Sequence, residues 1–213
     1  MKKGLLACAV FMVLAVLVAS TASAATNIKF GIKAGASSSN VKWTDDEGDE
    51  TSVTEPTFGA FVIFELSPTL AIQPEVNYLV TGEKWEITEG TNVENFTYIH
   101  IPILLRARLM KEGKFVPVVF AGPAVGFLLS AKDGGDDVKE YFKSTDFGVD
   151  LGLGAEIALG KMKALIDFRY YMGLTNCFDQ PDDLIGAAML MEPPPPDWSM
   201  KNSAFILTAG IIF

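Results

Sequence analysis

The chain contains a single histidine, His100, and histidine is the side chain most often used as a general base near neutral pH. On a β-strand, Tyr98 and Pro102 would share its face, because side chains alternate between two faces. A hydrolytic site would need a serine beside the histidine, since the base must take the proton of the nucleophile. Pro102 occupies the position that such a serine would take. We therefore expect His100 to be an interior or rim residue and the chain to have no enzymatic activity.

Charged side chains at alternate positions are a second candidate for chemistry. Asp167 and Arg169 are two residues apart, and Asp150 and Glu156 share one face of another alternating segment. Such groups could act as acid and base, but ion pairs with a purely structural role also shift the pKa values of their members. We interpret them as a structural ion network. The acidic stretch WTDDEGDETSVTE lacks the ligand spacing of an EF-hand, so we expect a solvated loop. Weak binding of a divalent cation is the alternative for this loop. We expect no cofactor.

These side chains lie in segments that alternate between apolar and polar residues with a period of two, which predicts β-strands. A helix would scatter the polar residues around its axis instead of gathering them on one side. Segment 115–131 is apolar on both sides and contains Pro117 and Pro123, so we expect a strand and assign no faces to it. The eight predicted strands are 28–36, 58–66, 70–82, 96–110, 115–131, 147–159, 162–172 and 201–213.

The connections between these strands alternate between tight and long. The tight ones have the sequences SPT, KEGK and GK, and the long ones are 37–57, 83–95, 132–146 and 175–203. Gly160 and Lys161 fit a two-residue type II′ turn, which needs glycine first. This turn sets a register that pairs Leu159 with Met162. The sequence therefore predicts an all-β fold of eight antiparallel strands in up-and-down order.

A period of two defines two faces but does not say which one is inside. A soluble lipocalin-like binding barrel would bury the apolar face, whereas a membrane barrel would turn it toward lipid. The polar face is rich in glycine and nearly balanced in charge, as a narrow interior with buried ions requires. The sorting of short turns and long loops is also typical of outer membrane barrels. We favour an eight-stranded antiparallel up-and-down transmembrane β-barrel, with the soluble barrel as the alternative.

The lumen of an eight-stranded barrel is expected to be filled by side chains and not to form an aqueous channel. Its predicted polar network consists of Lys29, Lys33, Glu65, Glu75, His100, Arg106, Arg108, Asp150, Glu156, Lys163, Asp167 and Arg169.

The first 24 residues have the layout of a secretory signal peptide. Lys2 and Lys3 precede an apolar core, and cleavage is expected between Ala24 and Ala25, which leaves 25–213 as the barrel domain. A lipoprotein site at Cys8 is disfavoured, because the apolar core follows that cysteine. Loss of the two lysines changes the net charge from −9 to −11, which argues against nucleic acid as a partner.

The predicted last strand presents alternate apolar residues to lipid: Phe205, Leu207, Ala209, Ile211 and Phe213. This pattern resembles the C-terminal aromatic signal of outer membrane barrels. The resemblance implies that the outer membrane assembly machinery is a partner.

A family resemblance covers the mature chain in order. It rests on FGIKAGASSSNV, FGAFVIFELSPTLAIQPEVNYLVTGEK, YIHIPILLRARL, FVPVVFAGPAVGFLLSAK, DFGVDLGLGAEIAL and the closing strand on Phe213. These stretches resemble PorT-like outer membrane β-barrel proteins of the "porin family". The resemblance implies the outer membrane of a Gram-negative bacterium and contact with lipid and lipopolysaccharide. It implies no particular activity, because the family is defined by its barrel.

The expected function is therefore a structural or surface-interaction role. One alternative is an adhesin or secretion-associated barrel that acts through loops 37–57 and 175–203. A further alternative is a lipid-modifying enzyme. Cys177 is expected to be an unpaired loop residue, since Cys8 is removed with the signal peptide.

Overall fold

The computed structural model describes residues 28–43, 51–87, 90–177 and 199–213. The expected signal peptide, its cleavage site at Ala24 and Ala25, and Cys8 lie outside these residues. The long strands are β1 (Ile28–Trp43), β2 (Thr51–Glu65), β3 (Leu70–Ile87), β4 (Gly90–Arg108), β5 (Phe115–Asp133), β7 (Thr145–Leu159), β8 (Met162–Gly173) and β9 (Met200–Ile212). A two-residue strand β6 (Asp136–Asp137) and a 3₁₀-helix η1 (Lys139–Tyr141) lie between β5 and β7.

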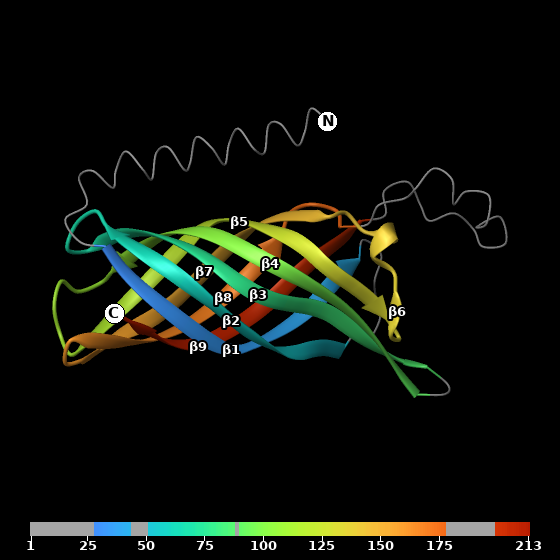
Figure 1. The fold of residues 1–213 in the computed structure, drawn as a ribbon, viewed down its shortest axis with the longest axis horizontal. Coiled ribbons are helices and arrows are strands. Elements are labelled where there is room, and N and C mark those ends of the chain that lie inside the picture. Colours follow the sequence, from blue (N-terminus) through green and yellow to red (C-terminus); the bar gives the residue numbers. More distant parts are fainter. Residues whose placement is uncertain (1–27, 44–50, 88–89, 178–198) are drawn as a thin grey trace, which may run out of the picture.

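The long strands form one closed antiparallel sheet (Figure 1). Each strand pairs with the next along the chain, β9 pairs back to β1, and the β4–β5 pairing completes the ring. Strand β6 pairs with the end of β5. The prediction of an eight-stranded up-and-down barrel is therefore confirmed. No helix among the described residues is long and apolar enough to cross a membrane.

The tight turns set the register of their hairpins as the sequence predicted. Leu159 pairs with Met162, and Gly152 faces Arg169 in the same ladder. Gly160 has a φ of 69°, the positive value that the first position of a primed turn needs. In the SPT hairpin, the amide of Leu66 donates to the carbonyl of Leu70.

The strands continue further on the long-loop side than predicted. Segments 37–57 and 83–95 were expected to be loops, but β1 and β2 stay paired out to Ser39↔Val53, and β3 and β4 out to Ile87↔Gly90. The strict apolar alternation is needed only where one face meets lipid. Beyond that belt the backbone ladder continues with polar side chains, so the sequence pattern fades before the strand does.

The distribution of side chains is the inverse of that in a soluble barrel. Large apolar residues point outward, with Phe30 58% and Leu153 59% exposed, while charged residues such as Glu75 and Arg106 are buried inside. On β9, Phe205, Leu207 and Ala209 are exposed and Ile211 is half-buried, and Phe213, directly after the strand, is exposed. This arrangement is that of a transmembrane barrel and excludes the soluble alternative.

Strand β5, whose faces the sequence left open, alternates like its neighbours. Val118 and Phe120 are buried in the lumen and Val119 is exposed. A register shift opposite Thr97 and Tyr98 resets this alternation near the outer end. The strand tolerates two prolines, and its ladder with β4 skips the pairs between Pro102↔Ala124 and Leu105↔Ala121.

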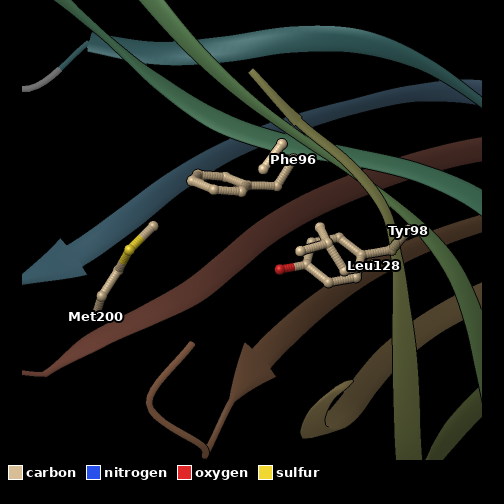
Figure 2. Packing of buried hydrophobic residues seen from close by; sticks show 5 residues of the cluster. Phe96, Tyr98, Leu128 and Met200 are labelled. Carbon is tan, nitrogen blue, oxygen red and sulfur yellow. The ribbon is translucent and has the colours of Figure 1, made fainter. Parts of the chain in front are cut away.

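An apolar cluster fills the lumen near the long-loop end (Figure 2). It contains Phe96, Tyr98, Leu128, Ala131 and Met200. Val138 and Phe142, from the connection between β5 and β7, pack against it, and the rings of Phe96 and Phe142 meet edge to face at 4.7 Å. We call this cluster the outer plug.

Candidate functional site: the ion-paired lumen

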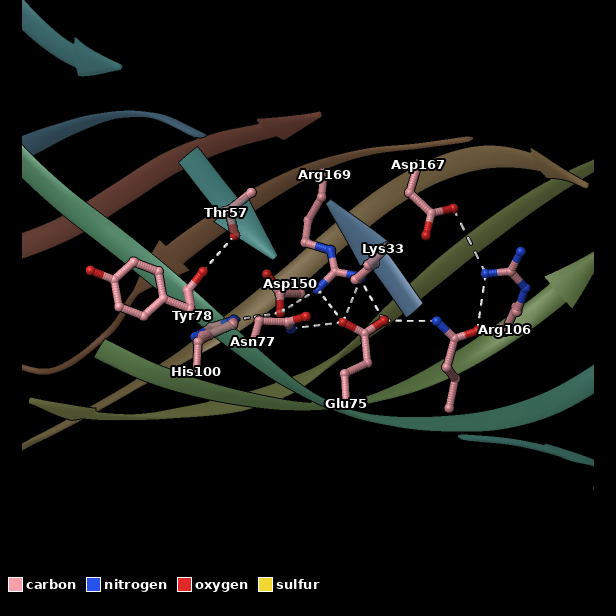
Figure 3. A network of polar contacts seen from close by, with 11 residues as sticks. Lys33, Thr57, Glu75, Asn77, Tyr78, His100, Arg106, Asp150, Asp167 and Arg169 are labelled. Carbon is pink, nitrogen blue, oxygen red and sulfur yellow. Dashed lines mark hydrogen bonds and ion pairs between the residues drawn. The ribbon is translucent and has the colours of Figure 1, made fainter. Parts of the chain in front are cut away.

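Glu75 lies at the centre of a polar network in the middle of the lumen (Figure 3). The Lys33 Nζ is 2.7 Å from its Oε2, and Gln73 and Asn77 donate amide hydrogen bonds to its two oxygens. Arg169 donates two further bonds, each 2.9 Å long. The Glu75 side chain is 0% exposed, so partners from β1, β3 and β8 replace water around this carboxylate.

Arg169 also reaches a second carboxylate, with its Nη1 3.5 Å from Oδ2 of Asp150. The same oxygen of Asp150 lies 2.9 Å from Nε2 of His100. The rings of His100 and Tyr171 meet edge to face with their centroids 4.7 Å apart, and the Arg169 guanidinium lies 5.3 Å from the centre of the Phe120 ring. His100 is therefore an interior residue, held between an acid and an aromatic ring.

Arg106 connects this central group to a second group closer to the short turns. Its Nη1 donates a 3.1 Å bond to Oε1 of Gln73 and lies 3.8 Å from Asp167. Its Nε lies 3.4 Å from Glu156. Arg106 is 1% exposed, so the link between the two groups is shielded from water.

The second group forms a chain of alternating charges across the barrel. Arg108 contacts Glu156 at 3.0 Å and Glu65 at 2.6 Å. Lys163 contacts Glu156 at 2.7 Å, and Lys29 contacts Glu65 at 2.7 Å. The structure thus brings every residue of the predicted lumen network onto the inner face and into one connected set of ion pairs and hydrogen bonds.

A further polar group was not anticipated from the sequence. Asp146 accepts hydrogen bonds from the hydroxyls of Tyr171 and Thr175, at 2.8 and 2.7 Å, and from the amide of Asn202 at 3.0 Å. Asn202 also donates to the hydroxyl of Tyr98 across the lumen. Asp146 falls in the predicted loop 132–146, and Asn202 lies where the predicted loop 175–203 and the predicted strand 201–213 overlap, so neither was included in the expected lumen network.

Cys177 borders this group and is 1% exposed. The Asn202 amide lies 3.2 Å from its sulfur, while its backbone bonds to Met200 and Lys143. Burial, together with the nearby Asp146 carboxylate, raises the pKa of the Cys177 thiol to about 12. The thiol is therefore neutral and shielded.

Acidic side chains line up on the inner face beyond the lipid-facing belt. In the sheet, Glu94 on β4 lies directly opposite Glu83 on β3 and directly opposite Asp133 on β5. Burial and these two carboxylates raise the pKa of Glu94 to about 8. Like charges in directly opposed positions destabilise a sheet, so protonation of Glu94 relieves the repulsion.

Enclosed space inside the central network is small. A cavity of about 10 Å³ is lined by residues that include Asn77, His100 and Arg169, which is room for roughly one water molecule. Among the described residues, no group of three or more His, Cys, Asp or Glu is arranged to hold a metal ion. Most of the acidic stretch predicted as a solvated loop (residues 44–50), and residues 178–198 of the predicted loop 175–203, lie outside the described ranges.

Comparison with known proteins matches residues 19–179 to the profile of a family described as "Outer membrane protein beta-barrel domain". A search of curated proteins found no match.

Two solved structures are similar in fold. Neisserial surface protein A, from Neisseria, has 12% identity and a TM-score of 0.52, covering 86% of this chain and 95% of that one. The outer membrane protein OprG from Pseudomonas aeruginosa has 13% identity and a TM-score of 0.51, covering 87% and 95%. At these identities the similarity concerns the fold alone.

Proposed function

Because the chain belongs to the family of outer membrane protein beta-barrel domains, we propose that it is a barrel with a closed lumen and a structural or surface-interaction role. Membership of this family places the protein in the cell outer membrane, in contact with membrane lipid. The role itself is proposed from the lumen and from the external end of the barrel.

The observation that carries the closed lumen is the pairing of Glu75 with Arg169. These residues come from β3 and β8, which lie opposite each other in the ring, so their two bonds cross the interior. The outer plug closes the same path nearer the long loops. Planar bilayer recordings of the purified protein test this proposal. We expect no steady conductance, and stable channels of porin size would overturn the closed lumen.

The surface-interaction role is supported by the paired extension of β3 and β4. This hairpin continues well past the apolar belt and projects from the long-loop end (Figure 1), which faces the cell exterior in outer membrane barrels. We propose lipopolysaccharide as the contact on this side. Shortening the hairpin by replacing 84–93 with Asn-Gly should weaken binding of purified lipopolysaccharide without preventing folding. Unchanged binding by the folded variant would contradict this role, and an adhesin or secretion-associated role would then be the alternative.

We also propose that the protein is not an enzyme. The support is that His100 is 2% exposed and its Nε2 is engaged by Asp150, so it does not reach lipid or solvent. Incubation with phospholipid and with lipid A should therefore leave both substrates unchanged. Hydrolysis by the wild type that is lost in H100A would favour the lipid-modifying alternative.

The type of barrel protein and the processing of its N-terminus are proposals as well. The resemblance of several strands supports a PorT-like protein, and the N-terminal pattern supports removal of residues 1–24 and a mature domain of 25–213. N-terminal sequencing of protein isolated from outer membranes should begin at Ala25. Retention of Met1 in that fraction would contradict the signal peptide.

A further inference from the structure

The short-turn end of the barrel contains a cavity of about 440 Å³. It is lined by Lys29, Glu65, Leu66, Ser67, Pro68, Arg108, Lys111 and Lys163. In outer membrane barrels this end faces the periplasm. We call this cavity the periplasmic mouth.

The periplasmic mouth has an excess of positive charge. Its cations are Lys29, Arg108, Lys111 and Lys163. Two carboxylates balance them in part: Glu65 lies between Lys29 and Arg108, and Glu156 lies between Arg108 and Lys163. Within the described residues, Lys111 has no carboxylate within ion-pair distance, so four cations face two acids. This local excess of two positive charges contrasts with the net charge of −9 of the whole chain.

The cations of the mouth are reachable from water, unlike those of the central network. The side chains of Lys29 and Lys163 are 29% and 33% exposed, whereas that of Lys33 is 3% exposed. The Arg108 side chain is 7% exposed and is held at the base of the mouth between the two carboxylates. The mouth thus combines one rigid guanidinium with several accessible ammonium groups, a set that suits phosphate or carboxylate oxygens.

We propose that the periplasmic mouth binds a soluble anion that carries more than one phosphate or carboxylate group. The volume falls within the usual range of small-molecule sites, roughly 300–1,000 Å³. Two charges in excess favour a ligand with at least two negative charges. The ligand enters from the periplasm, because Lys29, Glu65, Arg108 and Lys163 face the lumen and the ring of strands separates them from lipid. This site does not depend on the closed lumen or on the external end.

Inorganic pyrophosphate is a suitable probe, measured by ³¹P line broadening and by calorimetry on the protein in an uncharged, phosphorus-free detergent. We expect saturable binding that weakens as sodium chloride is raised, because exposed charges are screened. Lys111→Gln should raise the Kd several-fold, and Lys111→Gln combined with Lys163→Gln by about tenfold or more, as expected for removal of charges in direct contact with the anion.

Lys161→Gln is the matched control, since Lys161 lies in a turn at the same end but does not line the mouth. Heat-dependent gel migration would verify that every variant is folded. The single variant Lys111→Gln should fold normally, because Lys111 is exposed. The proposal is overturned if binding is not saturable, or if Lys161→Gln weakens it as much as Lys111→Gln. Nanodiscs that contain phosphatidylglycerol form a separate arm of the experiment. Binding of that lipid without binding of pyrophosphate would also overturn the proposal that the ligand is a soluble periplasmic anion.

Discussion

Glu75 and Arg169 form a two-point ion pair across the full width of the barrel, with both nitrogen-to-oxygen distances equal to 2.9 Å. The two side chains are 0% and 3% exposed. They belong to strands that are opposite in the ring, so the pair fixes the spacing of two walls that share no backbone hydrogen bonds. The pair therefore acts as an internal crosslink, in addition to closing the lumen.

Loss of one partner should destabilise the barrel strongly. In Arg169→Met, Glu75 keeps the contact with Lys33 but loses both bonds from Arg169. Breaking a buried pair typically costs about 3–5 kcal/mol. Urea unfolding in lipid vesicles, followed by tryptophan fluorescence, measures this cost. The double variant with Glu75→Gln should lose less than the sum of the single variants. Lys201→Gln, an exposed cation, is the control, and additive losses would contradict the crosslink.

The row of carboxylates beyond the membrane belt predicts a pH dependence of stability. The folded pKa of Glu94 is about 8, well above the ordinary value of 4.5. A group whose folded pKa is raised contributes stability that is complete below its unfolded pKa and is lost as the pH rises through the folded pKa. The barrel should therefore lose stability between about pH 4.5 and 8.

Glu94→Gln isolates this effect because the amide cannot ionise. We expect the variant to be about 1 kcal/mol more stable than the wild type at pH 9 and equal to it near pH 4, because only the ionised carboxylate meets the repulsion from Glu83 and Asp133. Urea midpoints across this range provide the measurement, with the exposed Glu140→Gln as the matched control. A gain that is the same at all pH values would show that Glu94 is not the titrating group.

Much of the fold followed from three features of the sequence: the period of two, the sorting of loop lengths and the turn at Gly160. The register of β7 and β8 could be predicted because a two-residue turn leaves no freedom in pairing. The inward direction of the charges could be predicted because glycine and balanced charge suit a narrow interior. These features depend only on neighbouring residues or neighbouring strands.

The partners across the lumen could not be predicted in the same way. Which strand faces which depends on the tilt and stagger of the closed barrel, which no local pattern contains. Asp146 and Asn202 were missed for a different reason. They lie at the outer ends of their strands, where the alternation that marks the inner face is weak in the sequence, although both side chains are buried in the lumen.

Cys177 should react slowly with maleimides and iodoacetamide in the folded protein. Its thiol is buried and its pKa is about 12, so the reactive thiolate is rare even at pH 9, where an ordinary thiol is half ionised. Labelling rates from pH 7 to 9 should stay low when folded and rise on unfolding in urea. Cys177→Ser identifies any background. Rapid labelling of folded protein that increases toward pH 9 would contradict the buried position.

Phe213 offers a way to separate assembly in the cell from stability of the finished barrel. In the structure its amide donates to the carbonyl of Phe30 at 2.8 Å, and its side chain is 60% exposed toward lipid. Phe213→Ser keeps the backbone bond and removes only lipid-facing surface, so refolding of the purified variant into vesicles should be nearly unchanged. If the assembly machinery recognises this residue, the folded fraction in outer membranes should fall several-fold in cells. Phe168→Ser, another lipid-facing aromatic on the neighbouring strand, is the matched control. Heat-dependent gel migration measures the folded fraction in both settings. Undiminished assembly of Phe213→Ser in cells would show that the assembly machinery does not recognise Phe213.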